Sequence, residues 1–311
     1  MDIIRLEPVF KQMIWGGTRL KTDFNYAIDG DAVGECWGIS AHQNGDCVVK
    51  DGLYAGMHLS SLYTEHKELF GNIKSEVFPL LTKIIDANND LSIQVHPDDD
   101  YAKEHENGSL GKTECWYVLD AKEDATIVIG HNASSSKEVK EMIEQGRWSD
   151  FIREIPVKAG DFFQINPGTV HAIKGGTLIL ETQQNSDVTY RVYDYDRLSN
   201  GKPRQLHVKQ SIDVIKAPFV PETPNKNPDI TANKNMDQLV SCPYYTVWKN
   251  SVSGEKRHVM DQPFMLVSII NGKGAINNSP ISKGDHFIIP NGYGNILYSG
   301  DMEMIISTPA Y

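Results

Sequence analysis

The chain has 311 residues and a formal net charge of −11, with 40% hydrophobic and 23% charged residues, so it is long enough for one large or two modest domains. The acidic balance argues against a nucleic-acid-binding surface, and no apolar run approaches the roughly 20 residues of a membrane-spanning helix. The N-terminus lacks signal-peptide features and the four cysteines show no zinc-finger spacing, so we expect a cytoplasmic protein with free thiols.

The first two thirds of the chain predict short strands interrupted by a few helices. The strand segments are rich in β-branched and aromatic residues, whereas the helical segments carry spaced apolar residues after a start signal. In chain order we expect helices at 59–70 and 98–106, strands at 115–119 and 125–129, a helix at 136–145, strands at 161–165 and 177–182, and a helix at 207–214. Many short strands favour a sandwich or barrel over a parallel α/β sheet.

A second group of strands is predicted near the C-terminus, after a segment rich in proline and asparagine. These strands are expected at 244–249, 264–271, 285–290 and 302–307. The composition of the segment before them is typical of a linker. We therefore predict a first domain at 1–216, a linker at 217–235 and a second domain at 236–311.

One turn pattern occurs in both predicted domains. The first copy spans 160–171 and ends in a histidine, whereas the second spans 284–295 and ends in an asparagine. When the Gly-Asp pairs that open the two copies are aligned, His171 corresponds to Asn295. This asymmetry predicts two related β-barrels, of which only the first carries a metal ligand.

Three segments of the first predicted domain carry the residue types of a metal site. Gln94 and His96 are two residues apart in a strand-like run, so both side chains point to the same face. Glu114 stands at the entry to another strand, and His171 ends the turn. Each has an ordinary structural explanation when taken alone. A small barrel brings such residues together, and imidazole, carboxylate and amide oxygen suit Zn²⁺, with other divalent ions as alternatives.

The same segments resemble a known family. The turn at 160–171 is similar to the second conserved motif of cupins, with Asn166 in place of the usual proline. Segment 78–98, FPLLTKIIDANNDLSIQVHPD, resembles the type I phosphomannose isomerases. The similarity continues through 111–114, 181–191, 34–40 and 15–17 and covers essentially the whole chain. It is similar to the short bacterial form, which lacks the extra helical domain of longer members.

The resemblance implies a mainly β fold of two cupin-like (jelly-roll) barrels, with a few helices inserted in or flanking the first. It implies a zinc-dependent aldose–ketose isomerase that interconverts mannose 6-phosphate and fructose 6-phosphate through a cis-enediol(ate). One zinc ion per chain is expected, held by His96, Glu114 and His171 with Gln94 as the fourth ligand. The second barrel is expected to hold no metal.

The resemblance also implies three catalytic residues. Arg191 occupies the position of the family's catalytic arginine, where a fixed charge suits a developing enediolate or a phosphate. Lys112 and Glu181 are the candidates for proton transfer, and the sequence leaves open which of them is the base.

The expected phosphate contacts are Lys83, Ser92 and Arg197, again by resemblance. Lys83 lies in an otherwise apolar run, which favours a paired or functional lysine. Arg197 has Asp194 and Asp196 nearby in the sequence as alternative partners.

Two other functions stay open on a cupin fold, because fold alone does not set function. They are a metal-dependent bicupin dioxygenase, a class that usually holds its metal through three histidines and a glutamate, and a non-enzymatic sugar-binding protein. The expected partner is a small sugar phosphate, without nucleic acid or membrane, and the expected state is a monomer or homodimer. The other eight histidines, His207 and His286 among them, are predicted to be surface or packing residues.

Overall fold

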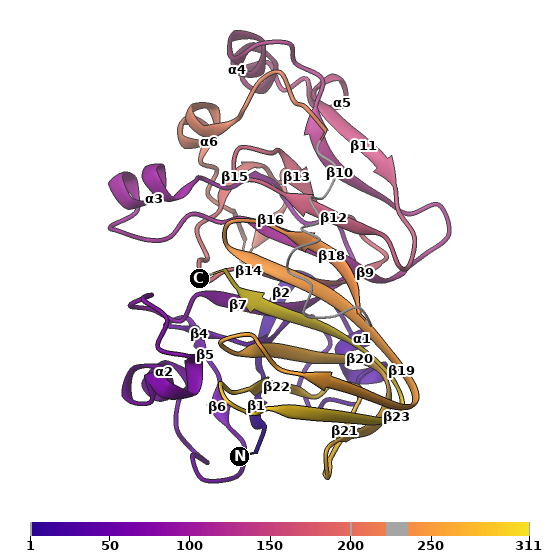
Figure 1. Ribbon diagram of the computed structural model, residues 1–311. Helices are drawn as coiled ribbons and strands as arrows, with labels where there is room; N and C mark the ends of the chain where they lie inside the picture. The colour runs from indigo at the N-terminus through magenta and orange to yellow at the C-terminus, as the bar shows by residue number, and fades with distance from the viewer. Residues whose placement is uncertain (1, 200, 222–235, 311) are drawn as a thin grey trace.

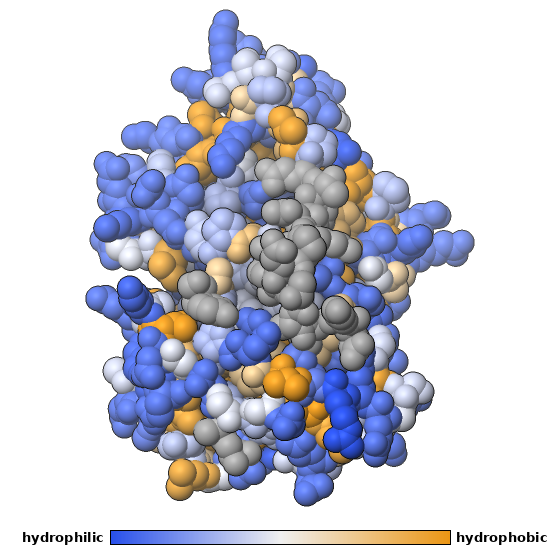
Figure 2. Space-filling model, viewed as in Figure 1, coloured by the Kyte–Doolittle hydropathy of each residue, from blue (hydrophilic) through white to orange (hydrophobic). Residues whose placement is uncertain are grey.

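The computed structural model describes residues 2–199, 201–221 and 236–310, which form three large β-sheets with short helices at their edges (Figure 1). The mainly β class predicted from the sequence is confirmed. Among the described residues, no helix is both long and apolar enough to span a bilayer. On the face seen in Figure 2, hydrophilic residues cover most of the surface, and hydrophobic residues lie in small separate groups.

An eight-stranded sheet is built mainly from the C-terminal third of the chain. Its strands, in spatial order, are β18 (Asp237–Ser241), β19 (Tyr245–Val259), β23 (Asn295–Pro309), β20 (Met265–Ile276), β22 (His286–Ile289), β1 (Ile4–Glu7) and β6 (Val48–Val49), with β21 (Ser279–Ser282) paired to β20. The N-terminal strand β1 therefore belongs to this sheet, where Ile4 lies opposite Ile288. The pairing of β1 with β22 therefore joins the N-terminal segment to the C-terminal third of the chain.

A six-stranded sheet forms the centre of the molecule. Its order is β12 (Phe162–Ile165), β9 (Glu114–Ala121), β14 (Thr177–Gln184), β7 (Leu80–Ala87), β2 (Val9–Gly17) and β3 (Val33–Ile39). Every residue of β7 and β14 is buried. Alternate residues of β14 are buried in two different hydrophobic cores. Leu180 belongs to the core that contains Leu266 of the C-terminal sheet, whereas Ile179 belongs to the core that contains Ile127 on the other side. Because both faces of these strands are buried, apolar residues occupy consecutive positions, as at residues 178–180, instead of alternating with exposed polar ones.

A five-stranded sheet packs on that other side of the central sheet. It contains β11 (Ile152–Pro156), β10 (Thr126–His131), β13 (His171–Ala172), β8 (Ile93–Val95) and β15 (Tyr190–Tyr193). Two small ladders complete the strands, β4 (Ala41–His42) with β5 (Gly45–Asp46), and β16 (Leu198–Ser199) with β17 (Lys202–Pro203). The space between the five-stranded and six-stranded sheets contains the predicted metal ligands.

The predicted helices are present, with one of them divided. Segment 59–70 forms α2 (Leu59–Glu65) followed by the 3₁₀ helix η1 (Lys67–Phe70), and the others are α3 (Asp99–His105), α4 (Ser136–Glu144) and α6 (Val208–Val214). Two further helices of one turn each, α1 (Arg19–Thr22) and α5 (Trp148–Phe151), were not predicted. Asp98 caps α3 by accepting the N–H of Tyr101 at 3.0 Å, as the carboxylates at its start suggest.

The C-terminal strands are longer than the sequence predicts. β19 and β23 pair without interruption from Tyr245–Pro309 to Val259–Asn295. Beyond Val252 the residues of β19 are mostly exposed and polar, so the pattern that marks a half-buried strand is absent there. Pairing with β23, rather than local hydrophobicity, defines this C-terminal half of β19.

The division into domains at 1–216, 217–235 and 236–311 stays a prediction, and residues 222–235 of the linker lie outside the described part of the chain. The two halves share one core. Leu6 and Leu180 from the first half cluster with Leu266 and Ile305 from the second. Thr182 Oγ1 also lies 3.1 Å from Ser307 Oγ across the same boundary.

Gly38 on β3 allows the ring of His286 on β22 to pack directly against the central sheet. A Cβ at this position would overlap the ring of His286, which Ser268 Oγ and the Tyr26 hydroxyl hold at 2.8 Å and 2.9 Å. We expect Gly38→Ala to lower the free energy of unfolding in urea by about 1–3 kcal/mol, as overpacking does. In a His286→Ala background the same change should have a much smaller effect, and an equal effect there would contradict this explanation.

Candidate active site

The five-stranded sheet places three of the predicted site residues in one row. His171 on β13 lies opposite Gln94 on β8, and Gln94 lies opposite Arg191 on β15. Cross-strand neighbours have Cα atoms roughly 5 Å apart, so this register brings residues distant in sequence to one place. The row lies at the edge of the space between the two sheets.

The six-stranded sheet contributes a second row, formed by Lys83, Glu181 and Trp116 on β7, β14 and β9. Lys83 Nζ lies 3.0 Å from Glu181 Oε1, and Trp116 Nε1 donates to Glu181 Oε2 at 2.9 Å. The Lys83 ammonium also lies 5.5 Å from the centre of the Trp37 ring. Burial disfavours the charged lysine, but Glu181 and Glu35 outweigh it and raise the pKa of Lys83. A lysine in this apolar run is thus paired, as its surroundings in the sequence suggest.

His96, Glu114 and His171 meet between the two sheets, and all three are buried. One nitrogen or oxygen atom from each residue lies within 4.8 Å of the others. Glu114 Oε2 is 3.4 Å from His96 Nε2, Glu114 Oε1 is 3.4 Å from His171 Nε2, and the two Nε2 atoms are 3.1 Å apart. The sequence prediction that these three residues converge is therefore correct in its geometry.

Backbone carbonyls determine which nitrogen of each imidazole faces this group. His96 Nδ1 lies 2.9 Å from the carbonyl of Val188, and His171 Nδ1 lies 2.9 Å from that of Thr169. Because a carbonyl only accepts, each Nδ1 carries the proton and each Nε2 presents a lone pair. Glu114 Oε1 is buried without a hydrogen-bond partner. Two nitrogen lone pairs and a carboxylate at one point form a donor set that fits a divalent cation such as Zn²⁺.

Gln94 and Lys112 stand between these three residues and solvent. The Gln94 amide is 3.2 Å from His171 Nε2 and would offer its oxygen to a cation after a simple rotation. Lys112 Nζ lies 3.1 Å from His96 Nε2, contacts Glu114 Oε2 directly, and is 3.9 Å from Glu181 Oε1. One ammonium therefore connects the buried group to the second row.

Burial and neighbouring charge hold the three buried residues in the protonation states that metal ligands need. Burial, followed by the nearby Lys112 ammonium, lowers the pKa of His96 to about 3, and burial also lowers the pKa of His171. Burial acts to raise the pKa of Glu114, but the adjacent Lys112 ammonium lowers it well below its usual range. At neutral pH the imidazoles are neutral and the carboxylate is ionised, as metal binding requires.

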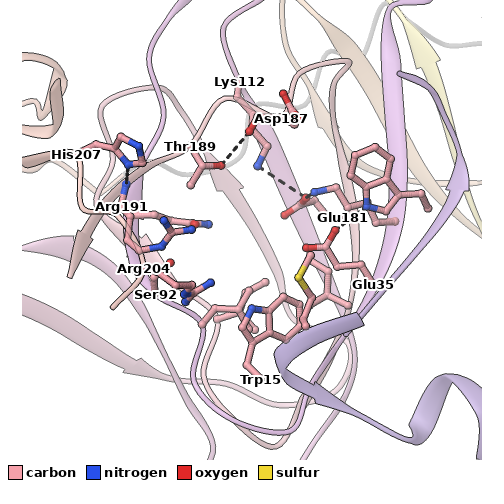
Figure 3. Close-up of a pocket in the computed structure, with 17 residues that line it drawn as sticks. Trp15, Glu35, Ser92, Lys112, Glu181, Asp187, Thr189, Arg191, Arg204 and His207 are labelled. Carbon is pink, nitrogen blue, oxygen red and sulfur yellow. Dashed lines mark hydrogen bonds and ion pairs between the residues drawn. The ribbon is translucent and has the colours of Figure 1, made fainter. Parts of the chain in front are cut away.

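Gln94 and Lys112 both line a cavity of about 370 Å³, which Figure 3 shows in close-up. Figure 3 shows Ser92, Arg191 and Arg204 on one side of it, with Glu181 across from them. A concave site with an aromatic wall and converging charged groups is typical of small-molecule binding.

The cavity brings together most, but not all, of the predicted site residues. Six of them line it: Lys83, Ser92, Gln94, Lys112, Glu181 and Arg191. The buried histidines and Glu114 lie behind this lining. Arg197 does not line the cavity. The three expected phosphate contacts are therefore not gathered in one place, because Lys83 pairs with Glu181, across the cavity from Ser92.

Several lining residues were given no role by the sequence prediction. Trp15, Glu35, Trp37, Asp187 and Thr189 fall inside segments that resemble the family, so their motifs carried a signal. His207, predicted as a surface or packing residue, also lines the cavity, and its Nδ1 lies 3.2 Å from the Arg191 amide nitrogen. Arg204 lies outside every segment that carried the resemblance to the family.

Asp194 fixes the two arginines that follow it. Arg204 Nε donates to Asp194 Oδ2 at 2.7 Å, and its Nη2 contacts Oδ1. Arg197 Nη2 donates to the same Oδ1 at 2.6 Å. The carboxylate is only 4% exposed, and it holds the chain between β15 and α6 against the mouth of the cavity.

Comparison with known proteins covers the whole chain. Residues 3–129 match the family described as phosphomannose isomerase type I, catalytic domain, and residues 235–309 match mannose-6-phosphate isomerase, cupin domain. Mannose-6-phosphate isomerase ManA of Bacillus subtilis is 49% identical over 306 residues, which are 97% of each chain. Mannose-6-phosphate isomerase of Streptococcus mutans is 50% identical over 313 residues, covering 97% of this chain and 98% of that one.

The crystal structure of the mannose 6-phosphate isomerase from Bacillus subtilis aligns with a TM-score of 0.94 at 44% identity, over 99% of both chains. The chain belongs to the type I phosphomannose isomerase family. The family and the cupin-like fold predicted from the sequence are confirmed. Within a phosphomannose isomerase fold, the buried group and the cavity in front of it define the candidate active site.

Asp194 gives this phosphomannose isomerase fold a pH-dependent contribution to stability. Burial acts to raise the pKa of Asp194, but Arg204 and Arg197 lower it overall. A carboxyl with a lowered folded-state pKa stabilises above its unfolded pKa, about 3.9, and loses that contribution as the pH falls further. We expect Asp194→Asn to lower the free energy of unfolding by about 2–3 kcal/mol at neutral pH. The difference from wild type should shrink below about pH 4 in urea titrations. If the difference in unfolding free energy between wild type and Asp194→Asn did not change with pH, this role of the Asp194 carboxylate would be contradicted.

Proposed function

We propose that this chain interconverts mannose 6-phosphate and fructose 6-phosphate through a cis-enediol(ate), with one divalent cation, Zn²⁺ in the first instance, in its site. The observation that carries the proposal is the buried donor set of His96, Glu114 and His171 directly behind a cavity lined by cationic groups. Full-length similarity to mannose-6-phosphate isomerases supports the choice of substrate.

The residues that would hold the cation are His96, Glu114 and His171, with Gln94 as the fourth ligand. Once bound, the cation would polarise a sugar oxygen as a Lewis acid or orient the substrate. The chain itself prepares this site, because carbonyl partners fix the tautomer of both imidazoles before any ligand arrives.

Lys112 and Glu181 are proposed to carry the proton between C2 and C1. Both line the cavity, and Lys112 Nζ is 3.9 Å from Glu181 Oε1. The Trp116 indole binds the other Glu181 oxygen, so the carboxylate is held in one orientation with Oε1 toward Lys83 and Lys112. Two titratable groups at this spacing can exchange a proton with the same substrate face. Which of them removes the proton stays open.

Arg191 is proposed to stabilise the negative charge of the enediolate. Its Nη1 donates to the Gln205 carbonyl at 2.8 Å, and its Nε is buried without a partner. A guanidinium stays charged at any working pH, so its attraction grows as negative charge develops on the sugar. Lys83 and Ser92 stay predicted substrate contacts, from different sides of the cavity.

The metal proposal predicts that the purified protein interconverts the two sugar phosphates, loses most of this activity after exhaustive chelation, and regains it with Zn²⁺. Glu114→Gln and His171→Ala should weaken zinc binding more than about 100-fold, measured as metal content after dialysis against a chelator. His131→Ala removes a buried histidine outside the group and serves as the control. An unchanged rate in protein shown to be free of metal would reject the metal's role.

Arg191→Ala is expected to lower kcat by about 10²–10³-fold, the loss seen when one oxyanion-stabilising donor is removed. The midpoint of unfolding should stay close to that of wild type, because the side chain is on the cavity wall. Arg191→Lys keeps the positive charge without the planar guanidinium, and its kcat should lie between those of wild type and Arg191→Ala. A kcat within a few-fold of wild type for Arg191→Ala would remove Arg191 from the catalytic group.

A further inference from the structure

Arg204 and Arg197 share one carboxylate but use their remaining hydrogen-bond donors differently. Arg197 donates Nε to the Asp194 carbonyl at 3.2 Å, and its Nη1 contacts the Asp90 carbonyl. Its guanidinium also lies over the Tyr195 ring, 5.1 Å from the centre. The donors of Arg197 are therefore directed into the protein.

Arg204 keeps donors available at the cavity. A guanidinium has five N–H groups. Asp194 occupies Nε and one hydrogen of Nη2, and among the described residues no acceptor binds the Nη1 hydrogens. Arg204 lines the cavity, and Figure 3 shows it on the same side as Ser92 and Arg191. A side chain already oriented by a buried carboxylate loses little freedom when it binds a ligand.

The charges on this side of the cavity favour an anion. Burial lowers the pKa of Arg191, and repulsion from the neighbouring Arg204 guanidinium lowers it further. Asp187 also lines the cavity, but Asn44 Nδ2 donates to its carboxylate at 2.6 Å and His42 lies 3.5 Å away. Asp194 is shared between two arginines. A dianion placed here would offset positive charge that the protein leaves uncompensated.

We propose that Arg204, positioned by Asp194, binds the phosphate of the sugar substrate together with Ser92. This inference rests on the proposed function, and it gives Arg204 the contact that resemblance assigned to Arg197. A planar guanidinium can donate two parallel hydrogen bonds to phosphate oxygens. Arg191, opposite Gln94 in the sheet register, then faces the sugar carbons nearer the metal ligands.

The two arginines offer a matched comparison, because Arg204→Gln and Arg197→Gln each remove one guanidinium from the same carboxylate. We expect Arg204→Gln to raise KM for mannose 6-phosphate and the inhibition constant of inorganic phosphate together, by roughly 10- to 100-fold, with a smaller change in kcat. Arg197→Gln should raise both constants at least tenfold less. Equal rises in the two variants, or a loss confined to kcat, would show that Arg204 only supports the loop.

A direct binding measurement separates this proposal from the isomerase activity itself. Titration of the zinc-loaded protein with inorganic phosphate in a calorimeter should detect binding to wild type and weaker binding to Arg204→Gln, whatever reaction the protein catalyses. Equal binding to both would overturn the proposal. If Arg204→Gln does not fold, Arg204→Lys keeps the charge without the fork. It should still raise the phosphate dissociation constant, and a wild-type value for that variant would reject the assignment.

Discussion

The burial of the Glu114 carboxylate is the constraint around which the site is arranged. Removing an ionised carboxylate from water is strongly unfavourable unless opposite charge and hydrogen-bond donors surround it. Here the Lys112 ammonium is its partner, both histidines turn nitrogen lone pairs toward it, and one of its oxygens still has no hydrogen bond. The residual demand for positive charge is what a divalent cation would satisfy. No single segment of the chain contains all the groups around Glu114, so the pairing register of the strands has to bring them together.

The C-terminal half of the chain packs on the face of the central sheet that lies opposite the cavity. Glu181 faces the cavity from β14, whereas its neighbour Thr182 points the other way and contacts Ser307 of the C-terminal sheet. Alternate residues of a strand face opposite sides. Residues of β14 that pack against the C-terminal half of the chain therefore help to position Glu181, which lies between them and faces the cavity. Leu180, next to Glu181 on its other side, is buried in the same shared core. The second half therefore works as the rigid support of the central sheet.

Much of the site was predictable from the sequence, and the exceptions have a common physical origin. Gln94 lies on β8 and His96 directly follows the end of that strand, two residues later, and the turn at 160–171 places His171, so local patterns determine these positions. Arg197 and Arg204 could not be separated in this way. Both follow Asp194 closely, and which of them turns toward the cavity depends on whether a distant acceptor, the carbonyl of Asp90, binds one of them. The length of β19 likewise depends on pairing with β23.

Charge distribution within the cavity shows why net charge says little about the substrate. The chain as a whole carries −11, yet its cavity has two contrasting walls. On one wall Lys83 faces Glu181, so the positive charge is matched within the protein. On the other, Arg191 and Arg204 are near one buried carboxylate, Asp194, which also pairs with Arg197. The matched wall suits proton transfer, because small movements of charge are balanced there. The unmatched wall suits a permanently anionic group, so the proposed substrate, with an enolisable end and a charged end, would enter the cavity in one direction.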